Sequence, residues 1–358
     1  MKYVARSIET VLCKAVRQSP AVIVTGPRQS GKTTLLRRLF LKSHQYVSLD
    51  HPDTRLQAIE DPELFLQNHP PPLIIDEIQY APDIFSWLKI HIDAHRNRAG
   101  QFLLTGSQSF PLMAGVTESL AGRISIFTLL SFSIREQMAN KKLTLNTLKA
   151  MILRGGYPEL AVNRKSDARL WFNNYVQTYL ERDLRQLVNI SNLTDFQRFL
   201  ELLAALNGQV LNLSTMSRDL GIAVNTVKNW ISILEASHQV ILIKPYYRNK
   251  GKRIVKSPKV YFLDTGLLCF LNGIYYHEQI FKGPSSGQLF EASVLGELIR
   301  KFHMEGEIPK IYWWRTNTGE EIDFILERGQ KIFPLEIKLT TRSHQGLIKN
   351  MASFCKLF

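Results

Sequence analysis

The chain has 358 residues, of which 45% are hydrophobic, and carries 45 Lys and Arg against 31 Asp and Glu, giving a net charge of +14. The apolar content supports packed globular domains, and the length exceeds what one core usually organises. Three distant cysteines, Cys13, Cys269 and Cys355, argue against a disulfide framework or a zinc site. No apolar run reaches membrane-span length and the start of the chain lacks a signal-peptide stretch, so we expect a soluble, cytoplasmic protein without membrane association.

The first predicted element is a buried strand at residues 21–24, AVIV, and the loop GPRQSGKTT follows it at 26–34. Gly26, Gly31, Lys32 and Thr33 fit the phosphate-binding pattern G-x-x-x-x-G-K-[ST]. The glycines allow a tight loop whose backbone N–H groups point at the β-phosphate, Lys32 would reach the β- and γ-oxygens, and the Thr33 hydroxyl would bind Mg²⁺. The helix predicted to follow presents its N-terminus to the anion.

A second apolar run, residues 72–75, leads directly into Asp76 and Glu77. Asp76 is placed to hold Mg²⁺ through water, and Glu77 to polarise an attacking water. A third strand at 101–104 ends near Thr105 and Ser107, which either sense the γ-phosphate or belong to an ordinary Gly- and Ser-rich turn. The residues expected to bind the nucleotide are Gly26, Pro27, Arg28, Gln29, Ser30, Gly31, Lys32, Thr33, Thr34, Asp76 and Ser107, with Thr33 and Asp76 as the Mg²⁺ ligands.

An arginine aimed at the γ-phosphate, from the same chain or a neighbouring one, speeds many such enzymes. Arg123 is the leading candidate because it follows the turn at 120–122 and precedes an apolar strand at 124–127. Arg154 and Arg182 are weaker candidates. The alternative is an ordinary ion pair with a surface acid. A role in a neighbouring active site would require a homo-oligomer.

Together these motifs resemble the AAA-type ATPases of bacteria and archaea that carry a C-terminal domain of unknown function. The resemblance rests on the loop at 26–34, DEIQ at 76–79, LTGS at 104–107, SLAGR at 119–123, LRGGYPE at 153–159 and YLERDL at 179–184. It covers nearly the whole chain and implies ATP binding by a P-loop core with an additional strand. It does not imply a physiological role.

Beyond the core, residues 135–205 have a helical pattern, and their aromatic side chains favour core packing over a binding site. Residues 211–243 follow helix-turn-helix order, with Ser214 as the expected cap of the first helix, Gly221 as its end and a second helix over 225–236. A segment without acids, KPYYRNKGKRIVKSPK at 244–259, predicts a basic β-hairpin, so the region looks like a winged helix. Such modules bind DNA or protein. The residues expected to contact DNA are Asn225, Thr226, Lys228, Asn229, Arg248, Lys250, Lys252 and Arg253.

The last region combines an amphipathic helix from about residue 288 with strands at 310–315, 321–326 and 331–338. Asp323 and Glu336 fall on successive strands, and Glu336 and Lys338 share a strand face because side chains alternate with period two. With Glu291 on the helix, this set resembles the restriction-endonuclease-like fold, in which such acids and a lysine bind Mg²⁺. The sequence ends soon after, so the domain looks truncated, and a solvated hairpin with ordinary charges remains the alternative.

These patterns predict an α/β fold with four parts: a P-loop core (1–135), a helical lid or connector (136–205), a winged helix (206–280) and a partial endonuclease-like domain (281–358). We expect an Mg²⁺-dependent ATPase that couples ATP to a region that binds double-stranded DNA, with cleavage by Glu291, Asp323, Glu336 and Lys338 left open. The alternative is a nucleotide-dependent switch or adaptor whose C-terminal modules bind protein.

Overall fold

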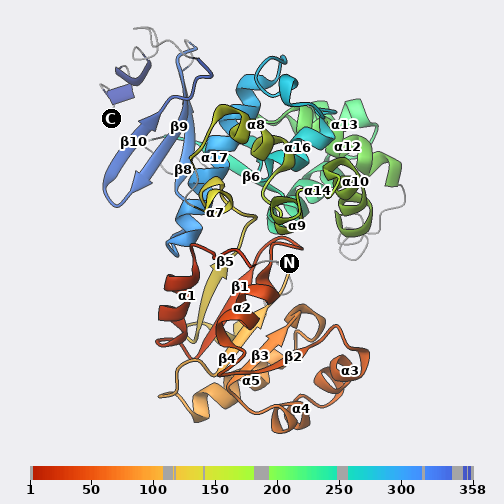
Figure 1. Ribbon diagram of the computed structural model, residues 1–358, viewed down its shortest axis with the longest axis vertical. Helices are drawn as coiled ribbons and strands as arrows, with labels where there is room; N and C mark the ends of the chain where they lie inside the picture. The colour runs from red at the N-terminus through yellow and green to blue at the C-terminus, as the bar shows by residue number, and fades with distance from the viewer. Residues whose placement is uncertain are drawn as a thin grey trace.

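The computed structural model describes residues 3–107, 116, 118–139, 142–180, 193–247, 257–316, 319–340, 350–352 and 354–355. The chain forms two lobes (Figure 1): the lower contains the helices and strands from α1 through β5, and the upper contains those from α7 through β10. Each lobe is built around a five-stranded sheet.

The sheet of the first lobe is parallel, in the order β2-β3-β4-β1-β5. Its strands are β1 (Ala21–Thr25), β2 (Gln45–Ser48), β3 (Leu73–Asp76), β4 (Phe102–Thr105) and β5 (Ile124–Thr128). The strands predicted at 21–24, 72–75, 101–104 and 124–127 are therefore confirmed. The additional strand is β4, which lies between β1 and β3.

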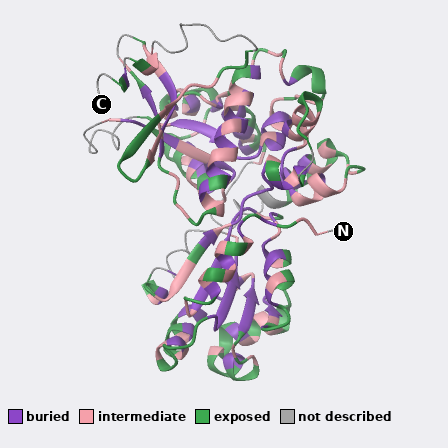
Figure 2. Cartoon of the chain, turned by 60° about the vertical axis from the view of Figure 1, so that its left-hand side comes forward, coloured by how far each residue is buried: buried purple, intermediate pink, exposed green. Residues whose placement is uncertain are grey.

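The three central strands β1, β3 and β4 are buried along their whole length (Figure 2) and are mainly apolar, because both faces of the sheet are covered. Alternate residues face opposite ways: Ile23 and Leu104 belong to one core cluster with Leu88, while Val24 and Leu103 belong to another with Leu36. The helices of this lobe are α1 (Glu9–Val16), α2 (Lys32–Phe40), α3 (Pro52–Glu60), α4 (Pro62–Asn68) and α5 (Ile84–Ala94), with a 3₁₀ turn η1 (Ile78–Tyr80).

The second lobe starts with short helices, as the helical pattern predicted. They are α7 (Ile134–Met138), α8 (Leu145–Arg154), α9 (Pro158–Val162), α10 (Ala168–Tyr175), the π-helix η2 (Val176–Leu180) and α12 (Leu193–Ala205). The aromatic residues Phe172 and Tyr175 are buried in the core cluster of this lobe. Core packing is thus what these aromatics do.

Two helices and a strand pair follow in helix-turn-helix order: α13 (Leu213–Leu220), α14 (Val224–Ala236), β6 (Val240–Pro245) and β7 (Lys259–Phe262). The cap of α13 differs from expectation. Asn212, not Ser214, accepts a hydrogen bond from Thr215 N at 3.1 Å, since an Asn carbonyl one residue before the helix reaches the free N–H groups of the first turn. Gly221 ends α13 in the left-handed region, with φ of 70°, as predicted.

The rest of the lobe consists of α16 (Thr265–Leu271), the 3₁₀ turn η3 (His277–Gln279), α17 (Ser286–Met304), β8 (Ile311–Arg315), β9 (Glu321–Arg328) and β10 (Lys331–Leu335). The β9–β10 hairpin has its two-residue turn at Gly329 and Gln330. However, β10 ends at Leu335, so Glu336 and Lys338 lie beyond the strand rather than on it.

One sheet connects the two regions that the sequence divided near residue 281. Its order is β10-β9-β8-β6-β7, and β6 pairs in parallel with β8 through Lys244 and Tyr312. A single core cluster contains Trp230 of α14, Leu295 of α17 and Phe324 of β9. The residues of the expected winged helix and endonuclease-like domain therefore fold as one unit.

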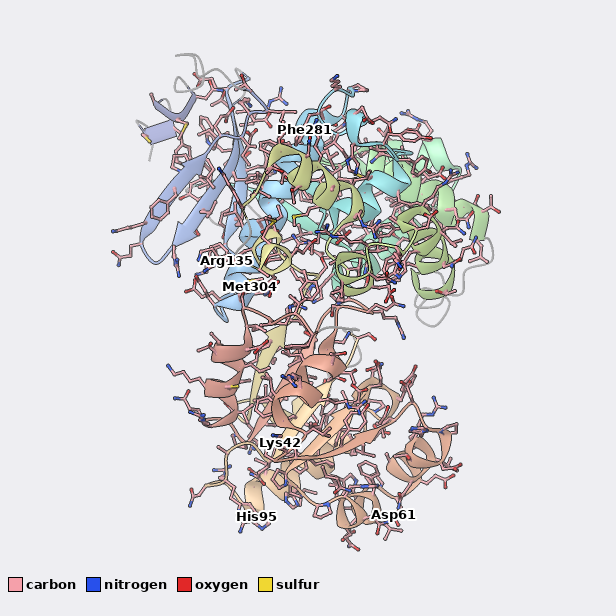
Figure 3. The ribbon with its side chains drawn as sticks, viewed as in Figure 1. Lys42, Asp61, His95, Arg135, Phe281 and Met304 are labelled. Carbon is pink, nitrogen blue, oxygen red and sulfur yellow. The ribbon has the colours of Figure 1, made fainter. Side chains whose placement is uncertain are left out.

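The two lobes meet where α17 ends beside α1. A Cβ on Gly306 would lie 3.3 Å from Val11 and 3.5 Å from Phe127, both of the first lobe. A cavity of about 570 Å³ opens between α1, α7 and α17, and its lining includes Arg135 and Met304, which lie at this junction in Figure 3. Among the described helices, none has both the length and the apolar character needed to cross a bilayer.

Candidate nucleotide site

The loop between β1 and α2 has the backbone that its glycines permit. Gly26 has φ of 139° and Gly31 has φ of 93°, and Gly31 is the residue before the first turn of α2. A Cβ on Gly26 would lie 2.2 Å from the Leu129 carbonyl oxygen, so only glycine fits against the end of β5. The loop, a glycine cradle, therefore packs through Gly26 against the residue that follows β5, and the contact is with the Leu129 backbone.

Lys32 lies inside this loop and is 5% exposed. Its Nζ donates to the carbonyl oxygens of Gly26 and Pro27, at 3.1 and 2.9 Å. The Ser30 hydroxyl is fully buried and has no hydrogen-bond partner in the described part of the chain. A lysine folded onto carbonyls and an unpaired buried hydroxyl both fit a loop that receives an anionic ligand.

Asp76, at the carboxyl end of β3, is the centre of a hydrogen-bond network with residues from three other elements. Its Oδ1 accepts from Thr33 Oγ1 at 2.8 Å and from Thr105 Oγ1, and its Oδ2 accepts from Tyr46 OH at 2.9 Å. Burial, followed by the negative charge of Asp76, raises the pKa of Tyr46 to about 12, so this hydroxyl stays protonated and donates. Thr33 and Asp76, the two expected Mg²⁺ ligands, are thus in direct contact.

Glu77 is the next residue, half-buried, with φ of 58° in the left-handed region. Its backbone N donates to Thr105 Oγ1 at 3.2 Å, and its carboxylate accepts from Gln79 Nε2. A non-glycine residue held at positive φ often marks a functional site. Thr105 therefore joins Asp76 to Glu77, whereas the hydroxyl of Ser107 is buried without a partner among the described residues.

Residues of the second lobe border this site. The side chain of Pro158, the first residue of α9, lies 3.7 Å from where a Cβ on Gly31 would be. His238, in the turn between α14 and β6, has its pKa lowered to about 3, mainly by burial and then by electrostatic interaction with His303 and Lys32. The loop is therefore at the junction of the two lobes.

Arg123 lies at the opposite end of the sheet from the loop. It precedes β5, and its carbonyl accepts from Ala21 N at the amino end of β1, five residues or roughly 16 Å before the loop begins at Gly26. Its guanidinium binds both carboxylate oxygens of Asp93, at 2.8 and 2.9 Å. Within one chain Arg123 is too far from the loop to act on a phosphate, which corrects the expectation of a role in the same chain.

The two weaker candidates, Arg154 and Arg182, do not provide an arginine at the phosphate loop in the described part of the chain. Arg154 Nη2 donates to the carbonyls of Leu160, Asn163 and Ser166, at 3.0 to 3.2 Å, and so holds the segment after α9. Arg182 lies outside the described residues.

The residues expected to contact DNA are described in part. Asn225, Lys228 and Asn229 are exposed on α14, and Thr226 is half-buried. Arg248, Lys250, Lys252 and Arg253, in the segment after β6, lie outside the described residues.

The structure brings three of the four candidate endonuclease-like residues, Asp323, Glu336 and Lys338, into contact, although Glu336 and Lys338 follow the strand. Lys338 Nζ lies 2.6 Å from Glu336 Oε1 and 3.6 Å from Asp323 Oδ2, and Asp323 also accepts from Ile337 N at 2.7 Å. Burial lowers the pKa of Lys338, but the hydrogen bond to Glu336 and the charges of Asp323, Glu336 and Glu291 outweigh it and raise the pKa overall.

Glu291 of α17 accepts a hydrogen bond from Tyr261 of β7. Burial raises the pKa of Glu291 to about 7, and the charge of Asp323 adds to this effect. Within the described ranges, no three His, Cys, Asp or Glu side chains converge closely enough to hold a metal ion. Lys338, Tyr261 and the Ile337 N–H contact these acids, whereas Glu336 Oε2 is buried with no hydrogen-bond partner among the described residues.

Comparison with known proteins agrees with the geometry of the first lobe. Residues 18–138 match the AAA domain, while residues 145–278 and 286–358 match two domains of unknown function, DUF8612 and DUF4143. Uncharacterised proteins of Mycobacterium bovis and Mycobacterium tuberculosis are each 34% identical over 333 residues, which is 92% of this chain and 73% of theirs. The chain belongs to the AAA-type ATPase family.

The fold of this AAA-type ATPase resembles that of a Walker-type ATPase of Pyrococcus abyssi. That structure has a TM-score of 0.52 at 15% identity, and the match covers 75% of this chain and 96% of the other. At this identity the likeness concerns the fold alone.

Sequence reasoning missed Tyr46 in this AAA-type ATPase. Tyr46 is in β2, at the sheet edge, and reaches Asp76 because β2 and β3 pair in register, with Tyr46 opposite Ile74. A tyrosine in a short strand carries no signal of such a contact, since the sequence does not state which strands are neighbours.

Proposed function

We propose that this chain is an Mg²⁺-dependent ATPase whose nucleotide state acts on the second lobe. The observation that carries the proposal is the contact between Thr33 and Asp76, 43 residues apart, beside a glycine cradle that contains Lys32. Hydroxyl and carboxylate oxygens in contact are the ligands that Mg²⁺ takes in phosphate-loop enzymes.

Each residue has a role in this proposal. Lys32 would leave the carbonyls of Gly26 and Pro27 to bind phosphate oxygens, and the unpaired hydroxyl of Ser30 would gain a partner. Thr33 and Asp76 would hold Mg²⁺, which with ATP supplies a phosphoanhydride whose charge is partly neutralised. Glu77 would orient and polarise the attacking water, and Thr105 would keep Asp76 and Glu77 in fixed relation.

The test is calorimetry with Mg·ATP together with steady-state turnover. We expect Lys32→Ala to abolish nucleotide binding, and Glu77→Gln to keep binding while losing turnover by about a hundredfold or more. Turnover by Glu77→Gln equal to that of the parent would remove Glu77 from its role. A parent chain that produces no heat with Mg·ATP would end the proposal.

We further propose that the second lobe binds double-stranded DNA. The net charge of +14 and the exposed Asn225, Lys228 and Asn229 on α14 favour a polyanion, and the helix-turn-helix order followed by a strand pair is that of a winged helix. ATP turnover should then rise with duplex DNA, and the rise should diminish as salt increases. Indifference to DNA at low salt would instead favour the protein-binding switch.

We do not extend this proposal to DNA cleavage. Lys338 pairs with Asp323 and Glu336, and Tyr261 binds Glu291, so a metal ion would have to displace several contacts. The cluster fits a nuclease-like fold that uses its charges to stabilise the β9–β10 hairpin. An arginine supplied by a neighbouring chain would require a homo-oligomer, and this also stays a prediction.

A further inference from the structure

One buried carbonyl oxygen of the phosphate loop, that of Ser30, receives its hydrogen bond from a residue outside the loop. A buried carbonyl oxygen needs a hydrogen-bond donor, and Lys32 supplies one to the carbonyls of Gly26 and Pro27. Gly31 O accepts from Leu35 N in α2, at 2.9 Å. Ser30 is fully buried, and its carbonyl accepts from Nη1 of Arg6, at 3.0 Å, from a segment 24 residues earlier.

Arg6 uses its other donors on the connection between the two lobes. Nη2 donates to Leu130 O at 2.7 Å, just after β5, and Nε donates to Glu136 Oε1 at 3.1 Å, in α7. The guanidinium carbon also lies 4.5 Å from the ring centroid of Phe132. Arg6 is 6% exposed, so the contacts are shielded from water.

Glu136 has further hydrogen bonds besides the one from the Arg6 side chain. Its Oε1 also accepts from Ser7 N at 2.8 Å, and its Oε2 accepts from Ser133 N at 2.8 Å in the capping box of α7. The acid that orients the guanidinium is therefore itself fixed. A planar fork with donors in three directions is a property of arginine that lysine does not share.

Arg6 and Lys32 differ in what ligand binding does to them. Lys32 must release the carbonyls of Gly26 and Pro27 to reach a phosphate, whereas the Nε, Nη1 and Nη2 of Arg6 are already directed to protein acceptors. The Arg6 contacts can therefore persist when the loop is loaded, and they fix the peptide between Ser30 and Gly31, whose N–H belongs to the cradle.

We propose that Arg6 is a positioning residue of the nucleotide site: by binding the Ser30 carbonyl, Leu130 and Glu136 at once, it preorganises the phosphate loop and ties it to the connection between the lobes. The proposal rests on the proposed ATPase function and deepens it. Arg6 touches neither nucleotide nor metal and acts through the loop.

The test compares Arg6→Lys with Arg300→Lys, measuring the Kd for Mg·ATP by calorimetry and the Tm without nucleotide. Arg300 is a matched control because it is 5% exposed, donates to Ser131 O and Leu263 O at 3.1 and 2.7 Å, and pairs with Glu297. Among the described residues it makes no hydrogen bond or ion pair with the phosphate loop. Both variants should lower Tm. Only Arg6→Lys should raise Kd, by about tenfold, with kcat less affected than KM.

Glu136→Gln provides a second variant that keeps the shape of the acid, and we expect it to raise Kd in the same direction by a smaller factor. An unchanged Kd in Arg6→Lys, or an equal rise in Arg300→Lys, would overturn the proposal, since the effect would then be absent or merely one of stability. A parent chain that binds no Mg·ATP would instead overturn the ATPase function, a result distinct from a parent and an Arg6→Lys variant that bind equally well.

Discussion

Replacement of Gly26 by alanine tests the glycine cradle directly. Two costs add at this position. The backbone φ of 139° is one that side-chain-bearing residues rarely adopt, and the new Cβ would lie 2.2 Å from Leu129 O and 3.0 Å from Leu129 C. These are backbone atoms, and Leu129 N is itself bound to Thr25 O at 2.8 Å, so neither partner can rotate away.

The magnitude follows from these two terms. Holding alanine at such a φ costs about 1–3 kcal/mol, and forcing a methyl group into packed backbone costs about 1–3 kcal/mol more. Alanine also restricts the unfolded chain, which returns about 0.4–1 kcal/mol. We therefore expect Gly26→Ala to lower the free energy of unfolding by about 3 kcal/mol and to abolish Mg·ATP binding, because the loop must move away from β5.

The matched control is Gly122→Ala. Gly122 also has positive φ, 74°, but a Cβ there would have nothing within 4 Å. Only the backbone term remains, so the expected loss is about 1 kcal/mol or less, with Mg·ATP affinity retained. The free energy of unfolding is measured by denaturant titration without nucleotide, monitored by circular dichroism. The Mg·ATP affinity is measured by calorimetry. If Gly26→Ala proved no more destabilising than Gly122→Ala, the close approach to Leu129 would not govern this loop.

Two further predictions concern charged residues. Because burial raises the pKa of folded Glu291 from 4.5 to about 7, the folded state keeps a proton that the unfolded chain releases, so the free energy of unfolding should fall as pH rises through this window. In denaturant titrations, the free energy of unfolding of Glu291→Gln should lack this pH dependence and should rise by about 2–3 kcal/mol relative to that of the parent between about pH 5 and pH 8. Parallel pH profiles of the two proteins would contradict the burial of a titrating carboxyl. Arg123→Ala should leave Mg·ATP affinity within about twofold, because its partner is Asp93 at the far end of the sheet. A tenfold loss of affinity in calorimetry would mean that Arg123 reaches a nucleotide site after all.

Much of the first lobe could be predicted because its signals are local. The β-branched run before Gly26 and the apolar run before Asp76 specify buried strands, and a strand pair of this kind orders the motifs along one edge of a parallel sheet. The contact of Thr33 with Asp76 follows from that order. The position of Arg123 could not be predicted in this way. Residues just before and just after a strand are equally close to it in sequence, but they lie at opposite ends of the strand, and Arg123 comes before β5.

The second lobe was harder to predict, for a related reason. The helices and hairpins could be found from periodicity and turn residues, but the parallel pairing of Lys244 with Tyr312 joins segments almost seventy residues apart. This pairing merges the two expected domains into one core. The sequence pattern predicted that Asp323, Glu336 and Lys338 would lie together, but only the tertiary structure shows that Lys338 pairs with both acids and that Tyr261 binds Glu291.

The sequence by itself determined the phosphate loop, because a glycine's freedom and the N–H groups of a helix start are properties of adjacent residues. The tertiary structure decided which groups complete it. Thr105 hydrogen-bonds to both Asp76 and Glu77 because β4 lies between β1 and β3 in the sheet. Arg6 binds Ser30, Leu130 and Glu136 because distant segments of the chain meet at its buried guanidinium. Such contacts depend on how strands and lobes are ordered in space, and strand order is a property of the whole chain rather than of any stretch of it.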